Sequence, residues 1–391
     1  MKILQLIPYF FLSWNNGEPA DLIHELSNSL VEMGHEVTVY TTDVFNKRSK
    51  LKNRKQIIDN IVVYEFDSMG RYPFVISLKM YMELSKTINN FDVIHINEFR
   101  GFQSNITHFL AKNKVPYIIQ AHGSLPTDIG SSLFKMSYDQ LFGYKILEDA
   151  SGVVAITEKE SKQYKAMGVS EERIEIIPNA IDYSKYKDLP DWGQFRNIYS
   201  IPKNENLLIY LGRLDETKGI DLIIESFNIL SSRSDNVKLI IAGNDYGCES
   251  DLKKLVKDLD LSNNIIFTGF LGMDEKISAL VDSDVFITPS YNGFPHTFLQ
   301  SCACGTPIIT TSKGDRLDWI DGNVGLVVEY NKNSLAIAIQ NILENDRLRN
   351  DFQLKCRKTI ENQFDWPIIA KKIEKLYLKV INENKIKGKF N

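Results

Sequence analysis

The chain has 391 residues, of which 43% are hydrophobic and 25% are charged, and its formal net charge is −4 at pH 7. This length exceeds what one hydrophobic core usually organises, so we expect two domains of nearly equal size. The slightly acidic balance argues against extensive nucleic-acid binding, because proteins that grip many phosphates carry a basic surplus.

The first half of the chain alternates short apolar runs with helical patterns, which is typical of a parallel sheet with crossover helices. Lys2–Ile7 is the first predicted strand. A signal peptide is the alternative, but Gln5 and Pro8 interrupt the apolar run and no small-residue cleavage site follows. Apolar residues at spacings of three and four then predict a helix that ends at Gly34. Further strands are predicted at Val37–Thr41, Ile61–Phe66, Val93–Ile96, Tyr117–Ala121, Val153–Ile156 and Ile174–Ile177.

This periodicity lapses over residues 179–203, where turn-forming residues collect. We place the domain boundary there, with an amino-terminal domain over residues 1–185 and a carboxyl-terminal domain over residues 200–367. A final helix over residues 368–391 follows a Trp-Pro pair that we expect to break the preceding element. The second half repeats the alternating pattern, with strands predicted at Leu207–Leu211, Lys238–Ala242, Ile265–Phe267, Val285–Thr288 and Ile308–Ile309.

The remaining composition points to the cytoplasm. The four cysteines show neither Cys-x-x-Cys pairing nor histidine partners, so we expect no disulfide framework and no zinc site. No stretch reaches the ~18–20 apolar residues that a membrane span needs. Two basic segments, residues 47–55 and Lys371–Lys389, are either solvated faces or surfaces that contact anionic lipid headgroups at the inner face of the membrane.

The strongest local signal is Gly212–Gly219, with the sequence Gly-Arg-Leu-Asp-Glu-Thr-Lys-Gly between a predicted strand and a predicted helix. Ligands bind at the carboxyl ends of strands in open α/β sheets. Arg213 can donate paired hydrogen bonds and Lys218 supplies a compact point charge, so the pair suits a diphosphate. The alternative is two surface charges at a helix start, where cations oppose the helix dipole unless an anion is close.

A second signal spans Thr288–Pro307, where a strand enters a turn containing glycine and proline and then a helix. Backbone N–H groups at the start of such a helix form an anion site. Gln300 would project from the first turns of this helix. The alternative is an ordinary strand–turn–helix unit whose Gly-Thr-Pro end leads into the next strand.

These two segments, their order and their separation resemble the donor half of the GT-B glycosyltransferases of family 4. The resemblance extends along nearly the whole chain, and the joint order of its pieces is specific although each piece alone is weak. It implies a GT-B fold, in which two doubly wound Rossmann-like α/β domains face a central cleft and the last helix crosses back to the first domain. The other matching pieces are Gly34–Val39, Asp92–His95, Ile156–Glu158, Ile177–Asn179 and Phe364–Trp366.

The resemblance also implies what each half binds. The first domain would hold a glycan or lipid-linked acceptor, and the second would hold a nucleoside-diphosphate sugar. His122, in Ala121–Gly123, matches the histidine that faces the reacting sugar, where a neutral imidazole would hydrogen-bond a hydroxyl or stabilise developing positive charge. The alternative is a structural histidine, which is the role expected for His95. The residues implied for donor binding are Gly17, Arg213, Lys218, Asn292, Gly293, Phe294, Pro295, His296, Thr297 and Gln300.

The chain departs from the family at two of these positions. Family members usually carry two glutamates where this chain has Asn292 and Gln300. A carboxylate accepts two strong hydrogen bonds from a ribose diol, whereas an amide accepts through one oxygen. The loss at each position is on the order of 1–3 kcal/mol if the hydrogen bond is buried. We therefore expect a less negative sugar pocket, which would repel a donor sugar with a carboxylate less strongly.

These observations favour a retaining, metal-independent glycosyltransferase, in which retention is implied by the resemblance alone. Arg213, Lys218 and helix amino termini would stabilise the diphosphate leaving group, so we expect no metal and no other cofactor. The segment Asp282–Asp284 has Asp-x-Asp spacing, but it precedes a strand and indicates a turn. The alternatives are a sugar-nucleotide epimerase of the same fold and a catalytically weak nucleotide-sugar-binding scaffold subunit, which the two amides favour.

Overall fold

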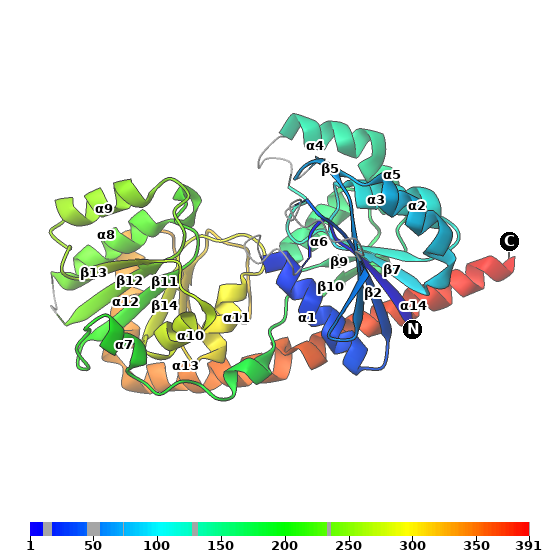
Figure 1. Cartoon of the computed structure of the whole chain (residues 1–391). Helices are drawn as coiled ribbons and strands as arrows, with labels where there is room; N and C mark the ends of the chain where they lie inside the picture. The colour runs from blue at the N-terminus through cyan, green and yellow to red at the C-terminus, as the bar shows by residue number, and fades with distance from the viewer. Residues whose placement is uncertain (11–17, 45–54, 73, 127–131, 233–235, 391) are drawn as a thin grey trace. The chain divides into compact units, whose positions relative to one another are not determined.

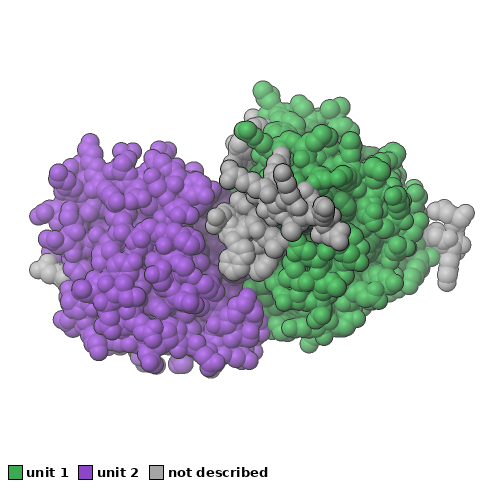
Figure 2. Space-filling view, viewed as in Figure 1, with its two compact units in different colours: residues 1–179, 366–391 green, residues 180–365 purple. Residues whose placement is uncertain are grey.

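A computed structural model describes residues 1–10, 18–44, 55–72, 74–126, 132–232 and 236–390. The chain divides into two compact units, coloured separately in Figure 2. Unit 1 comprises Met1–Asn179 and Trp366–Asn391, and unit 2 comprises Ala180–Asp365. Gly17 and all but the last residue of the basic segment 47–55 lie outside the described residues. In the described part of the chain, no helix is long and apolar enough to cross a membrane.

Unit 1 contains an eight-stranded sheet in the order β10-β9-β8-β7-β1-β2-β4-β3 (Figure 1). All neighbouring pairs are parallel except the edge strand β3, which runs antiparallel to β4. The central strands are buried on both faces, which explains their nearly continuous apolar sequences. Strands β5 and β6 form a separate antiparallel hairpin. The strands are β1 (Lys2–Leu6), β2 (Glu36–Thr42), β3 (Lys55–Ile58), β4 (Ile61–Phe66), β5 (Met69–Arg71), β6 (Phe74–Ile76), β7 (Val93–Ile96), β8 (Tyr117–Gln120), β9 (Gly152–Ala155) and β10 (Ile174–Ile176).

The helices of unit 1 include the last helix of the chain, α14, which packs against α1 as the resemblance implied. This helix begins at Trp366, two residues earlier than predicted, and Pro367 is its second residue. The preceding helical element ends at Phe364, just before the Trp-Pro pair, as expected. Proline is tolerated in the first helical turn, where its missing N–H would have no partner in the helix. The helices are α1 (Glu18–Glu32), α2 (Leu78–Thr87), α3 (Phe102–Ala111), α4 (Ser132–Tyr138), α5 (Tyr144–Asp149), α6 (Glu158–Ala166) and α14 (Trp366–Phe390), with a π-helical turn, η2, over Asp139–Gly143.

Unit 2 contains a six-stranded parallel sheet in the order β13-β12-β11-β14-β15-β16. Its strands are β11 (Asn206–Leu211), β12 (Val237–Ala242), β13 (Ile265–Gly269), β14 (Val285–Thr288), β15 (Ile308–Thr311) and β16 (Gly325–Val328). Its helices are α7 (Gln194–Ile198), α8 (Ile220–Ser231), α9 (Glu249–Asp258), α10 (Met273–Val281), α11 (His296–Ala303), α12 (Lys332–Glu344) and α13 (Asp346–Thr359), with short turns η5 (Glu216–Lys218) and η6 (Ile360–Phe364).

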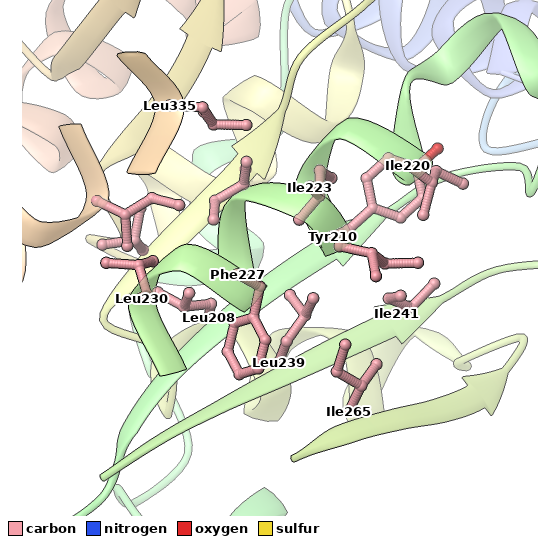
Figure 3. Packing of buried hydrophobic residues seen from close by; sticks show 14 of the residues in the cluster. Leu208, Tyr210, Ile220, Ile223, Phe227, Leu230, Leu239, Ile241, Ile265 and Leu335 are labelled. Carbon is pink, nitrogen blue, oxygen red and sulfur yellow. The ribbon is translucent and has the colours of Figure 1, made fainter. Parts of the chain in front are cut away.

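One hydrophobic core of unit 2 lies between the sheet and helices α8, α9 and α12 (Figure 3). Alternate residues of β11, Leu208 and Tyr210, point to this face, because successive side chains of a strand alternate between the two faces of the sheet. Ile223 and Phe227, one helical turn apart on α8, are fully buried against them. This packing fixes the position of the β11 carboxyl end, from which the first motif segment starts.

The expected α/β fold class with parallel sheets is confirmed. Four short strands were not predicted from the sequence: β3, β5, β6 and β16. Strands β3, β5 and β6 are three or four residues long and largely exposed, and β16 is a four-residue strand at the edge of its sheet, so each gives only a short signal in the sequence.

Candidate functional site

The first motif segment forms a fixed turn at the carboxyl end of β11. The Tyr210 hydroxyl donates a hydrogen bond to the Arg213 carbonyl at 2.8 Å. Asp215 caps η5, because its carboxylate accepts from the Thr217 backbone N–H at 2.9 Å and from the Thr217 hydroxyl at 2.7 Å. Gly219 has a φ of 70° and leads into α8. Glycine suits this left-handed conformation, and an added Cβ would lie 2.8 Å from the Tyr330 hydroxyl oxygen.

Two cations stand on this turn. The Arg213 side chain is 55% exposed and lies 3.9 Å from the Asp215 carboxylate. Its guanidinium also lies 5.0 Å from the centre of the Tyr246 ring. Lys218 is the last residue of η5, directly before Gly219. The pKa of Asp215 lies below its usual value, mainly because Thr217 donates to the carboxylate and to a smaller extent because Arg213 and Lys218 are near. The turn therefore carries two cations, Arg213 and Lys218, beside two acids, Asp215 and Glu216.

The second motif segment is held by an aspartate that sequence reasoning missed. Gly293, with a φ of 69°, donates its backbone N–H to the Asp315 carboxylate at 3.2 Å. The Tyr291 hydroxyl donates to the Asp315 carbonyl. Asp315 itself is buried in the loop after β15, the strand next to β14. Because the Gly293 amide is engaged in this way, a donor group that binds there must displace the carboxylate or bind beside it.

The other residues of this segment differ in exposure. Asn292 is exposed, whereas Gln300 is 6% exposed within α11. Phe294 is buried, with its ring 5.9 Å from that of Trp319. Pro295 lies at the amino cap of α11, whose first two residues are His296 and Thr297. The buried position of Gln300 favours a replacement without charge, since a lone buried carboxylate is costly.

The structure brings the two motif segments to the same edge of the unit 2 sheet. Strands β11 and β14 are direct neighbours, so their carboxyl ends lie side by side. An added Cβ on Gly219 would be 3.5 Å from the Pro289 side chain, which places the start of α8 beside the turn after β14. Gly243, at the end of β12, approaches Gly212 so closely that a Cβ there would overlap the Gly212 carbonyl oxygen. Backbone groups thus line this edge.

The Asp-x-Asp sequence in unit 2 supports the domain core. Asp282 is buried and its carboxylate accepts from the backbone N–H groups of Gly193 and Arg196. The Asp284 carboxylate accepts from the Leu207 N–H at 2.8 Å. Both are therefore occupied in structural hydrogen bonds. Within the part of the chain that the structure describes, no group of three or more His, Cys, Asp or Glu side chains is placed to hold a metal ion.

His122 lies in a tight turn at the carboxyl end of β8 in unit 1. His122 and Gly123 have φ values of 50° and 79°, and Ser124 closes the turn by donating its N–H to the Ala121 carbonyl at 3.0 Å. Glu160 of α6 holds the turn from outside, because its carboxylate accepts the Gly123 N–H at 2.7 Å. A non-glycine residue in the left-handed region is strained, and such strain often accompanies functional sites.

A chain of buried hydrogen bonds leads from His122 to the last helix. His122 Nε2 lies 3.3 Å from Asn97 Oδ1, and Asn97 Nδ2 donates to Gln5 Oε1 at 2.8 Å. Gln5 Nε2 donates to the Tyr377 hydroxyl at 3.2 Å, and that hydroxyl lies 2.8 Å from His95 Nδ1. His95 thus has the supporting role that was expected of it. Asn97, Gln5 and Tyr377 were not predicted, although Asn97 directly follows a strand at its carboxyl end.

Burial keeps both histidines neutral. It lowers the pKa of His122 to about 4. It also lowers the pKa of His95 to about 3, with a smaller contribution from the nearby His122. Among the described residues, no group hydrogen-bonds to the buried His122 Nδ1. A small pocket beside this residue is lined by apolar side chains of α1 and α14, among them Leu22 and Trp366. Nδ1 of His122 is therefore a covered acceptor that no described residue uses.

Comparisons of the sequence and the fold with known proteins find glycosyltransferases. A model for "Glycosyltransferase Family 4" matches residues 20–185, and one for "Glycosyl transferases group 1" matches residues 193–359. An uncharacterized glycosyltransferase of Methanocaldococcus jannaschii is 26% identical over 379 residues, covering 90% of this chain and 92% of its own length. The N-acetylgalactosamine-N,N'-diacetylbacillosaminyl-diphospho-undecaprenol 4-alpha-N-acetylgalactosaminyltransferase of Campylobacter jejuni is 30% identical over 206 residues, 52% of this chain and 53% of its own. The solved structure of Anabaena HepE in complex with UDP and glucose has a TM-score of 0.73 at 18% identity, covering 96% of this chain and 98% of its own.

Proposed function

Because the chain belongs to the GT-B glycosyltransferases of family 4, we propose that it moves a sugar from a nucleoside-diphosphate sugar to a lipid-linked glycan, with retention of configuration at the anomeric carbon. Unit 2 binds the donor in this proposal and unit 1 binds the acceptor. No metal ion or other cofactor takes part.

The positions of Arg213 and Lys218 carry the donor assignment. Both stand at the carboxyl end of β11, and Arg213 is half-exposed with its nearest carboxylate, Asp215, only at the limit of ion-pair distance. A diphosphate bound here would lie beside these two cations and the amino terminus of α8, whose positive end favours an anion. These groups stabilise the leaving nucleoside diphosphate, which is the part a metal ion plays in other transferases. The UDP bound to Anabaena HepE makes uracil the first nucleobase to test.

His122 serves the reacting sugar in this proposal. During transfer the bond between the anomeric carbon and the diphosphate oxygen breaks, and a bond from an acceptor hydroxyl oxygen to that carbon forms. The hydroxyl proton passes to the leaving diphosphate, so no proton is left on the protein. His122 accepts a hydrogen bond from a donor-sugar hydroxyl at Nδ1, and its neutral state is supported by its lowered pKa of about 4. A neutral imidazole does not repel the developing positive charge of the sugar ring.

A lipid-linked acceptor is supported by an apolar face of unit 1. The Campylobacter relative is named for an acceptor carried on diphospho-undecaprenol. In this chain, large apolar side chains of the β5–β6 hairpin and of α4 are exposed, and Phe74 packs against Phe134 with ring centres 4.7 Å apart. Exposed apolar patches mark membrane or partner contacts. We define the apolar face by Met69, Phe74, Ile76, Leu133, Phe134 and Met136. Its contact with the membrane gives the enzyme access to the lipid.

Asn292 and Gln300 favour one alternative, a nucleotide-sugar-binding scaffold subunit without turnover. Product analysis separates the two functions. The chain is incubated with uridine-, adenosine- and guanosine-diphosphate sugars and a lipid extract from cells that make the protein. Release of the nucleoside diphosphate with a glycosylated lipid supports transfer, and the anomeric configuration of the product decides retention. Donor binding without product supports the scaffold, and an isomerised donor supports an epimerase.

A further inference from the structure

Glu98 stands at the carboxyl edge of the unit 1 sheet beside the residue that holds His122. It follows Asn97, directly after β7, and β7 lies between β8 and β1 in the sheet. Its carboxylate reaches over Gly101, where an added Cβ would be 3.0 Å from Oε2. Gly101 is the amino cap of α3. The carboxylate is therefore on the same edge as His122 but belongs to a different strand end.

Three tyrosines from separate parts of unit 1 lie near this carboxylate. The charge of Glu98 contributes to raising the pKa of Tyr9, Tyr72 and Tyr138, so all three lie close to it. The rings of Tyr9 and Tyr72 meet edge to face with centres 5.4 Å apart, and their hydroxyls share a hydrogen bond. Tyr72 is exposed, whereas Tyr9 and Tyr138 are buried, so the cluster meets solvent on the Tyr72 side.

The carboxylate has no partner that explains its position. Among the described residues, none donates a hydrogen bond to it and no cation pairs with it. The neighbouring Arg100 is engaged by the Asp139 carboxylate and by the carbonyls of Ser124 and Leu125. Burial raises the pKa of Glu98 to about 8. A half-buried carboxyl group that keeps its proton up to about pH 8 and has no donor among the described residues is typical of a ligand site.

We propose that Glu98, flanked by Tyr9, Tyr72 and Tyr138, is the subsite that binds the sugar of the acceptor. The carboxylate accepts a hydrogen bond from an acceptor hydroxyl, and the tyrosine rings pack against the apolar face of the sugar ring. Aromatic walls with a few polar groups are the usual make-up of small-ligand sites. The assignment rests on the proposed transfer reaction, because it supplies the second substrate of that reaction.

The chemistry also sets a pH dependence. The charged carboxylate is the stronger hydrogen-bond acceptor, so affinity for the sugar rises as pH passes through about 8. The facing groups do not titrate in this range. The pKa values of the three tyrosines are raised above 10, and His122 stays neutral. The other charged groups nearby are Arg100 and Asp139, which form an ion pair at 2.7 Å.

The test measures binding of n-octyl glucoside, galactoside, mannoside and N-acetylglucosaminide below their micelle concentrations. Saturation-transfer NMR is recorded on the full chain between pH 6.5 and 9. We compare wild type with Glu98→Gln, which removes the charge, and with Gly101→Ala, which displaces the carboxylate. Glu171→Gln is the matched control, because that side chain is 83% exposed and pairs only with Lys165 among the described residues.

We expect at least one glycoside to bind wild type and Glu171→Gln through its sugar protons, with affinity rising through pH 8. Glu98→Gln should weaken this binding at least 10-fold and abolish its pH dependence, and Gly101→Ala should weaken it too. The proposal is overturned if no glycoside binds wild type, or if Glu98→Gln binds equally well. UDP binding, followed by thermal shift, reports the donor side separately. Intact UDP binding in Glu98→Gln also shows that the variant is folded.

Discussion

The side-chain oxygen of Asn97 lies 3.3 Å from Nε2 of His122. Asn97 Nδ2 donates to Gln5 Oε1 at 2.8 Å and points to the His95 carbonyl oxygen at 3.5 Å. If the Asn97 amide were turned over, its oxygen would instead face these two oxygens. The Asn97 oxygen must therefore accept, so His122 carries its proton on Nε2. This leaves Nδ1 without a proton and able to accept a hydrogen bond. A residue after β7 thus sets the tautomer of a histidine after β8.

Removing the Tyr377 hydroxyl tests this hydrogen-bonded chain. Tyr377→Phe leaves the Gln5 amide and His95 Nδ1 without a partner, which should destabilise unit 1 by roughly 1–3 kcal/mol. Because Gln5 then no longer fixes Asn97, we also expect kcat for transfer to fall about 3- to 10-fold, or ~0.7–1.4 kcal/mol, with the donor KM unchanged. Tyr199→Phe, in unit 2, is the control. If Tyr377→Phe has the stability and kcat of wild type, this chain of hydrogen bonds does not support His122.

The neutral histidines predict a loss of stability in acid. The folded-state pKa of His122 is lowered to about 4, below the unfolded value near 6.5, so the unfolded chain binds more protons between these values. The free energy of unfolding should therefore fall as pH drops from 6.5 to 4, by up to about 1.4 kcal/mol per pH unit for this residue. His122→Asn should show a shallower slope in urea unfolding. Parallel slopes would mean that His122 titrates normally.

Glu98 predicts the opposite trend in alkali. Its folded-state pKa, raised to about 8, exceeds the unfolded value near 4.5, so the folded chain holds a proton that the unfolded chain has lost. Stability from this group is present below pH 4.5 and is lost as pH rises towards 8. Glu98→Gln should therefore melt above wild type at pH 8.5, by roughly 2–4 °C, and equal it at pH 5. A variant that melts lower at both pH values would rule out the raised pKa.

Gln300→Glu tests how the second motif binds the donor. If position 300 meets the ribose, a carboxylate should tighten binding of the nucleoside diphosphate about 10-fold, equivalent to ~1.4 kcal/mol. The ligand-free variant should melt at a lower temperature, because the side chain is only 6% exposed. Calorimetric titration and thermal melts measure both effects, with the exposed Gln194→Glu as control. Unchanged affinity would remove Gln300 from the donor site.

Sequence reasoning found the sheets because buried parallel strands leave continuous apolar runs, as in β7 and β14. It placed Arg213 and Lys218 at the carboxyl end of β11, because the order strand, turn, helix predicts that the turn lies there. It missed Asp315, whose contact with Gly293 spans two loops. It also missed Tyr377, because the pairing of a residue on the last helix with a residue of β1 is set by tertiary packing and has no local pattern.

Glu98 could have been found from its position alone. It follows a predicted strand at the carboxyl end, where ligands bind in open sheets. The tyrosines near it are Tyr9, Tyr72 and Tyr138, which are far apart in the sequence. The fold brings them together, so their spacing in the sequence could not predict the cluster.

The most direct measurement is calorimetric titration of uridine, adenosine and guanosine diphosphates into wild type, Arg213→Ala and Lys218→Ala. We expect one nucleoside diphosphate to bind wild type and each variant to bind it at least 10-fold more weakly, a loss of ~1.4 kcal/mol, with the melting temperature nearly unchanged. Lys355→Ala, which removes a cation paired with Asp351, should bind as wild type. Full-strength binding by both Arg213→Ala and Lys218→Ala would contradict the donor site.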